Sequence, residues 1–157
     1  MNDIQLYRVI IPAADLDASQ AFYAELLDQP GMRISGGRHY FRCGSVVLAV
    51  YSPAGDGDRT TPHANFGHVY FAIDGLETYF ARAQALECLD ASTGDGGLPM
   101  GEIATRPWGE RSFYCHDPLG NPLCVVDRTT IESACTVWGE TTWQRTARWS
   151  IGEPKTE

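Results

Sequence analysis

The pattern of apolar and polar residues changes from a strand-like period to a helical one and back again. Residues 5–12 are apolar and rich in β-branched side chains, which is typical of a strand. Apolar side chains then follow helical spacing from Leu16 to Leu27, with Asp15 placed to cap this helix and Pro30 placed to stop it. Three further strands are predicted, at residues 31–35, 38–43 and 45–52.

The second half of the chain repeats this order. A segment that begins at His68 has the form of the segment that begins at Arg8, an extended run that leads into a helix signal. The later elements are a strand over 67–73 and a helix from Leu76 to Leu86, followed by three strands near 102–107, 111–116 and 122–127. The repeat therefore predicts two copies of a unit of strand, helix and three strands.

This organisation predicts a single domain over residues 1–128. Module one covers 4–52, a linker covers 53–66 and module two covers 67–128. The remaining residues, 129–157, form an extension that holds Trp138, Trp143 and Trp149. Indole rings at this density usually pack on something. Two interpretations stay open for the extension: a strap over its own domain or a dimer partner, or a lid over a ligand site.

Charge and cysteine content narrow the functional classes. The chain has 157 residues and a formal net charge of -8, which disfavours nucleic acid and anionic membrane surfaces as partners. No apolar run reaches the length of a membrane helix, and the start of the chain does not resemble a signal peptide. The five cysteines are an odd number without a C-x-x-C motif, so we expect reduced thiols in the cytoplasm.

Two motifs and the repeat itself resemble a known superfamily. The motifs are Asp15-Leu-Asp-Ala-Ser-Gln-Ala-Phe-Tyr23 and Asp117-Pro-Leu-Gly-Asn-Pro-Leu123. Together they resemble the glyoxalase/bleomycin resistance protein/extradiol dioxygenase proteins, also called the vicinal oxygen chelate superfamily. The resemblance implies an α+β fold in which two tandem βαβββ modules form a cupped mixed sheet. It also implies a homodimer.

The resemblance further implies metal ligands on the first and last strands of each module in the enzymes. These four positions fall on Arg8, Ala49, His68 and Cys124. A guanidinium has no lone pair to donate and alanine has no donor atom, whereas His68 fits and Cys124 fits only as a thiolate. We therefore predict no cofactor and no complete metal centre. If a divalent metal binds, His68 is the first candidate ligand and Cys124 the second.

Strand alternation places several candidate ligand-binding side chains on the face that would line the cup. Arginine offers a forked donor for a carboxylate, and aromatic rings offer stacking surfaces. Arg8 alternatively pairs with a buried acid of its own chain, and Trp108 either stacks on a ligand at the mouth of the cup or simply packs at a turn. The predicted ligand-binding residues are Arg8, Tyr51, His68, Tyr70, Trp108, Tyr114 and Cys124.

Two functions remain open, and the sequence does not decide whether the protein is an enzyme. The first is a binding protein for a small aromatic or anionic molecule. The alternative is a metal-dependent lyase, isomerase or dioxygenase that uses His68. Cys124 is a nucleophile only if Arg8 or His68 lowers the pKa of its thiol. The charged neighbours of Trp108, which are Arg106, Glu110 and Arg111, are expected to form an ion pair that fixes the Trp108 loop.

Overall fold

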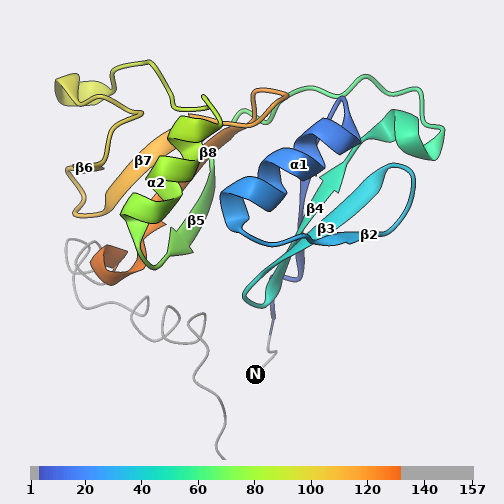
Figure 1. Ribbon diagram of the computed structural model, residues 1–157, viewed down its shortest axis with the longest axis horizontal. Coiled ribbons are helices and arrows are strands. Elements are labelled where there is room, and N and C mark those ends of the chain that lie inside the picture. The colour runs from blue at the N-terminus through green and yellow to red at the C-terminus, as the bar shows by residue number, and fades with distance from the viewer. Residues whose placement is uncertain (1–3, 132–157) are drawn as a thin grey trace, which may run out of the picture.

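The computed structural model describes residues 4–131 and contains two sheets, each accompanied by one helix (Figure 1). The predicted extension beyond residue 131 lies outside the described residues. Module one consists of β1 (Arg8–Pro12), α1 (Leu16–Leu27), β2 (Met32–Arg33), β3 (Arg38–Cys43) and β4 (Val46–Tyr51). Module two consists of β5 (Val69–Ile73), α2 (Leu76–Ala85), β6 (Ala104–Thr105), β7 (Arg111–His116) and β8 (Pro122–Asp127). Both modules therefore have the predicted βαβββ order.

Both sheets have four strands with the same topology. Their orders are β1-β4-β3-β2 and β5-β8-β7-β6, and the first strand of each runs parallel to the last strand of its module. The other neighbouring strands are antiparallel. The two sheets are thus mixed sheets of one design, which confirms the predicted fold class.

Four of the strands are shorter than predicted. Strand β1 begins at Arg8 rather than at residue 5, and β5 begins just after His68. Strand β2 covers only two residues because the chain already turns at Ser35, where the Ile34 and Ser35 amides both donate to the Arg38 carbonyl. Strand β6 is equally short, since a buried arginine described below takes the carbonyl of Glu102 away from strand pairing.

The first helix has the cap that the sequence predicts. The Asp15 side chain accepts a hydrogen bond from the Ala18 amide at 3.1 Å, which satisfies one of the free amides of the first turn. The helix ends at Leu27 rather than at Pro30. Asp28 adopts a left-handed conformation with φ 53°, and this closes the last turn earlier than proline would.

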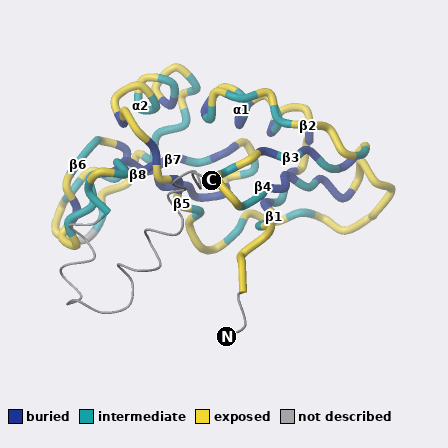
Figure 2. Tube along the Cα trace, turned by 90° about the horizontal axis from the view of Figure 1, so that it is seen from below, coloured by how far each residue is buried: buried dark blue, intermediate teal, exposed yellow. Residues whose placement is uncertain are grey.

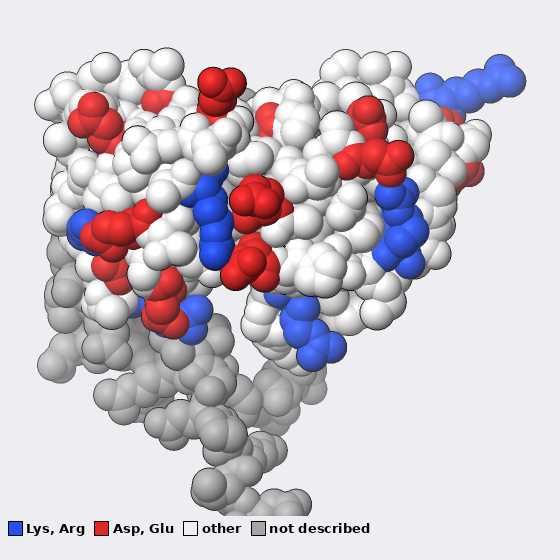
Figure 3. Space-filling model, viewed as in Figure 1, with Lys and Arg blue, Asp and Glu red and all other residues white. Residues whose placement is uncertain are grey.

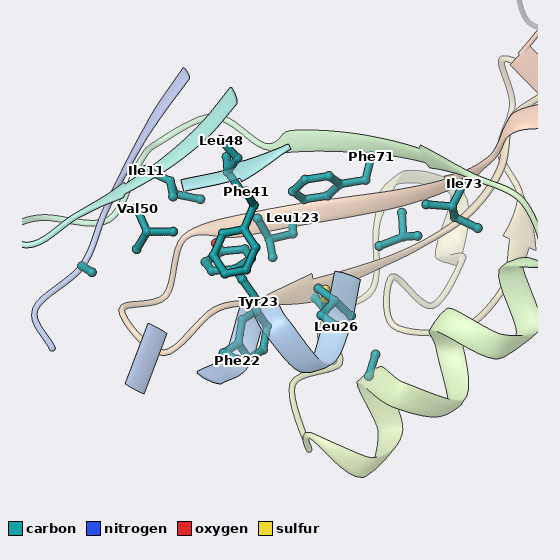
Figure 4. Packing of buried hydrophobic residues seen from close by; sticks show 14 of the residues in the cluster. Ile11, Phe22, Tyr23, Leu26, Phe41, Leu48, Val50, Phe71, Ile73 and Leu123 are labelled. Carbon is teal, nitrogen blue, oxygen red and sulfur yellow. The ribbon is translucent and has the colours of Figure 1, made fainter. Parts of the chain in front are cut away.

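Both helices lie on the same side of the two sheets (Figure 2). Tyr23 and Leu26 of α1 point into a core that also contains Phe41 of β3 and Phe71 and Leu123 of module two (Figure 4). One core therefore spans both modules, and α1 contacts α2. Among residues 4–131 neither helix covers the opposite side of the strands, which is the side that a ligand or a partner could reach. We call this side the helix-free face.

The turn between β7 and β8 joins the two modules by buried hydrogen bonds. The Asn121 side chain donates to the Pro12 carbonyl of β1 at 2.8 Å and accepts from the Asn65 amide of the linker at 2.8 Å. The side-chain amide of Asn121 also donates to the Asp117 carboxylate. That carboxylate accepts a second hydrogen bond, at 2.7 Å, from the Tyr23 hydroxyl. Burial, together with Asp117, raises the pKa of Tyr23. We call this set the junction network.

The outer surface over the helices carries acidic and basic side chains next to one another (Figure 3). One ion pair, between Arg82 and Asp28 at 3.1 Å, links α2 to the end of α1. Within residues 4–131, no helix has the length and apolar composition needed to cross a membrane.

Candidate functional site

Three of the predicted site residues lie in one row across module two. Tyr70 of β5 pairs with Cys124 of β8, which pairs with Tyr114 of β7. Residues that pair directly across neighbouring strands point to the same side of a sheet, so these three side chains all lie on the helix-free face. The Tyr70 and Tyr114 rings are 6.5 Å apart between centroids, and His68 meets Tyr114 edge-to-face at 5.1 Å. The structure therefore brings together four of the seven predicted residues.

The Cys124 thiol is not activated. It is fully buried beneath Tyr70 and Tyr114 rather than beside Arg8. Burial raises the pKa of Cys124 to about 11, although hydrogen bonds with Ser112 and Tyr114 act in the opposite direction. The condition under which Cys124 would act as a nucleophile, a pKa lowered by Arg8 or His68, is therefore not met. A thiol whose pKa is raised in this way is a poor nucleophile at neutral pH.

A pocket of about 530 Å³ lies on the helix-free face of module two. Its wall is mostly apolar, and the Trp108 side chain is held at its edge by a 2.9 Å hydrogen bond from the indole nitrogen to Glu110. The lining residues are Tyr70, Ala72, Trp108, Glu110, Val126 and Ile131. Glu110 is a lining residue that is not among the predicted site residues. Strand alternation carried backwards from Tyr114 and Ser112 reaches this position and would have found it.

Arg106 fixes the loop that carries Trp108. Its guanidinium is 3 % exposed and lies 5.0 Å from the centre of the Tyr114 ring. It donates to the Ser112 hydroxyl and to four backbone carbonyls, those of Pro99, Met100, Glu102 and Ser112. The loop is thus held by a buried cation with neutral partners.

The prediction that the charged neighbours of Trp108 form an ion pair with one another is therefore wrong. Arg106 binds carbonyl oxygens, and Arg111 instead reaches Glu77 of α2 and Asp127 of β8. The physical reason is that carbonyl groups of the irregular loop already surround the Arg106 guanidinium, so no carboxylate is needed. This leaves the Glu110 carboxylate with the Trp108 indole as its hydrogen-bond partner.

Two predicted site residues, Arg8 and Tyr51, belong to module one and lie outside the lining of this pocket. The Arg8 guanidinium stacks on the Tyr7 and Tyr40 rings at 5.0 and 5.1 Å. It has no carboxylate within 4.0 Å among the residues that the structure describes, so the alternative of a buried acid partner is not realised there. The Arg38 guanidinium lies over the Tyr51 ring, 4.5 Å from the ring centre.

Two further histidines, His39 and His116, are not among the predicted site residues. His39 is buried on the helix side, where its Nε2 atom lies 2.9 Å from the Pro30 carbonyl. His116 ends β7, with its Nε2 atom 3.7 Å from an Asp90 oxygen. Burial alone would raise the pKa of Asp90, but hydrogen bonds from Ser92 and the facing imidazoles of His116 and His68 lower it.

The four superfamily metal positions do not form a fitting donor set. Arg8 and Ala49 supply no donor, which leaves only His68 and the buried thiol of Cys124, one ligand short of the three protein ligands that a catalytic metal usually takes. In a dimer the four positions would be filled by the same four residue types. The set of donors is therefore incomplete whether the positions come from one chain or from two. Among residues 4–131, no three His, Cys, Asp or Glu side chains gather closely enough to hold a metal.

Comparisons with known proteins agree with this fold. A model of the glyoxalase/bleomycin resistance protein/dioxygenase superfamily matches residues 5–125. A search of curated proteins found no significant match.

Three solved structures illustrate the range of similar proteins. Oxidase ChaP-H1 is 24 % identical with TM-score 0.63, and the match covers 80 % of this chain and 97 % of that chain. A lactoylglutathione lyase from Agrobacterium tumefaciens is 23 % identical with TM-score 0.56, over 88 % and 99 % of the two chains. A bleomycin resistance determinant encoded on the transposon Tn5 is 18 % identical with TM-score 0.56, over 79 % and 98 %.

These structures share the fold of this chain, although one is named an oxidase, one a lyase and one a resistance determinant. Fold alone therefore does not assign a reaction. The family model, by contrast, spans both βαβββ modules, and the structure has the strand order and the repeated register that the resemblance implies. The chain belongs to the glyoxalase/bleomycin resistance protein/dioxygenase superfamily.

Proposed function

We propose that this protein binds a small aromatic molecule on the helix-free face of module two, without a complete metal centre at the superfamily positions. The observation that carries the proposal is the pocket between Tyr70 and Trp108. Its volume of about 530 Å³ lies within the range of small-molecule sites, roughly 300–1,000 Å³. Two aromatic side chains at its edge and a floor of Ala72 and Val126 suit a flat apolar ligand.

Arg8 supports a second, anionic subsite in module one. Its guanidinium is positioned by Tyr7 and Tyr40, and no carboxylate of the described residues neutralises it. A forked guanidinium of this kind suits a carboxylate or phenolate ligand. This subsite lies on the other module from the pocket, so the two are separate parts of the proposal.

We expect Tyr70→Ala to weaken the binding of 2-naphthol, an uncharged aromatic probe, by at least about tenfold. The loss follows from removing one wall of the pocket, and tenfold corresponds to ~1.4 kcal/mol. Isothermal titration calorimetry on the full chain measures it. Phe66→Ala is the control, because Phe66 is fully exposed and does not line the pocket. No binding to the wild type at millimolar probe, or equal losses in both variants, would contradict the proposal.

We also propose that a second copy of the chain covers the helix-free face. Strands β1 and β5 are both edge strands, and each presents a large apolar side chain to solvent: Ile10 is 55 % and Tyr70 is 54 % exposed. Leu6 and Tyr7 extend the exposed apolar surface at the start of β1. An apolar surface of this kind typically marks an interface.

Sedimentation equilibrium of the full chain is therefore expected to give twice the chain mass of 17.3 kDa at micromolar concentration. Ile10→Asp is expected to raise the dimer dissociation constant at least about tenfold, since a carboxylate would be buried without a partner. Ile34→Asp, at an exposed apolar residue next to β2, serves as the control. A monomeric wild type would refute the dimer.

A further inference from the structure

The pocket of module two contains one side chain that its apolar character does not explain. Glu110 is the charged member of the six lining residues, and it is half-buried. Within residues 4–131, no arginine, lysine or histidine nitrogen lies within 4.0 Å of its carboxylate. The two arginines that flank it in sequence, Arg106 and Arg111, have other partners.

The carboxylate is also held in a fixed place. The Trp108 indole nitrogen donates to one of its oxygens at 2.9 Å, and no group within residues 4–131 donates to the other oxygen, which can accept from a ligand. Trp108 and Tyr70 both line the same pocket. A carboxylate beside two electron-rich aromatic rings is an arrangement that attracts a positive charge from two directions.

We propose that this pocket selects organic cations, specifically a substituted ammonium group on a small aromatic or alkyl framework. The positive group lies against Trp108 and Tyr70 and faces the Glu110 carboxylate, and the apolar framework covers Ala72 and Val126. This inference rests on the proposed function, because it names the ligand class of the same pocket.

Three physical arguments support a cation over a neutral ligand or an anion. Ammonium groups bind the faces of tryptophan and tyrosine, and tryptophan binds them best. A partly buried carboxylate without a cationic partner gains most from a ligand that brings the missing charge. The formal net charge of -8 further favours the approach of cations to the surface.

The test uses two probes of one shape that differ by a positive charge: 3-hydroxyphenyltrimethylammonium and 3-tert-butylphenol. Calorimetric titration of the full chain is expected to show at least tenfold tighter binding of the cation. Glu110→Gln is expected to remove this preference and to leave the affinity for 3-tert-butylphenol within about twofold. Glu102→Gln is the matched control, because Glu102 is an exposed glutamate of the same loop and does not line the pocket.

The outcomes separate this inference from the proposal on which it rests. Equal affinity for the two probes, or a cation preference that survives in Glu110→Gln, overturns the cation inference and leaves the aromatic pocket intact. Tighter binding of the anion 3-hydroxybenzoate than of the cation overturns it as well. If no probe binds the wild type at millimolar concentration, both proposals fail. A preference that falls equally in Glu102→Gln also overturns the role of Glu110, because it then reflects the general negative charge.

Discussion

Replacing Asn121 with alanine is expected to lower the free energy of unfolding by about 3 kcal/mol or more. Three hydrogen bonds of its buried side chain are lost, and the half-buried Pro12 carbonyl and Asn65 amide are left without these partners. Each buried polar group stranded in this way costs ~1–3 kcal/mol. Urea unfolding followed by circular dichroism measures the change.

Two further variants show whether this loss belongs to the junction network. Tyr23→Phe removes only the hydroxyl that donates to Asp117, so a smaller loss of roughly 1–2 kcal/mol is expected. Asn65→Ala keeps the backbone amide that donates to the Asn121 side chain, so little change in the free energy of unfolding is expected. If Asn121→Ala were no more destabilising than Asn65→Ala, the turn between β7 and β8 would not join the modules energetically.

Replacing Arg106 with alanine is expected to destabilise the protein by about 3–5 kcal/mol and to weaken ligand binding as well. The variant loses five hydrogen bonds and leaves a cavity, and four carbonyl oxygens and the Ser112 hydroxyl then lack this donor in a buried region. The loop that carries Trp108 would no longer be fixed. Thermal and urea unfolding measure the first effect, and titration with 2-naphthol measures the second.

Two substitutions serve as comparisons. Arg59→Ala removes an arginine from the exposed linker and is expected to change stability by less than about 0.5 kcal/mol. Arg106→Lys keeps the positive charge but cannot reach all five acceptors, so we expect it to recover only part of the loss. Full stability in Arg106→Lys would show that charge alone, rather than the forked geometry, holds the loop.

The sequence predicts the arrangement of the strands well because strand alternation is a local property. Alternation predicts which residues share one face of a strand, and the resemblance to the superfamily implies that Tyr70 and Cys124 lie in one cup. The strand register places Tyr114 in the same row. The partners of Arg106 could not be predicted, since they are carbonyls of an irregular loop and no side-chain pattern marks them. The pKa of Cys124 depends on which neighbours cover it and how deeply, so it also emerges only from the folded chain.

The same limit explains why Glu110 was expected in an ion pair. Adjacent arginines in the sequence suggest a local charge cluster, but successive strand residues point to opposite faces. Arg111 accordingly reaches Glu77 of α2, whereas Glu110 lines the pocket. Which charged side chains line a pocket therefore depends on the face of the strand to which each residue points, and not on how close the residues are in the sequence.

The shared register of the two sheets also has an evolutionary consequence. Ile10 pairs with Ala49 and Ala49 with Tyr40, in the same way that Tyr70 pairs with Cys124 and Cys124 with Tyr114. A lone ancestral module that paired with its own copy would have offered identical linings, and every substitution would have appeared twice. Fusion of two copies into one chain removes that symmetry. A mutation then changes one lining alone, so the two halves of the molecule are free to specialise for chemically different ligands.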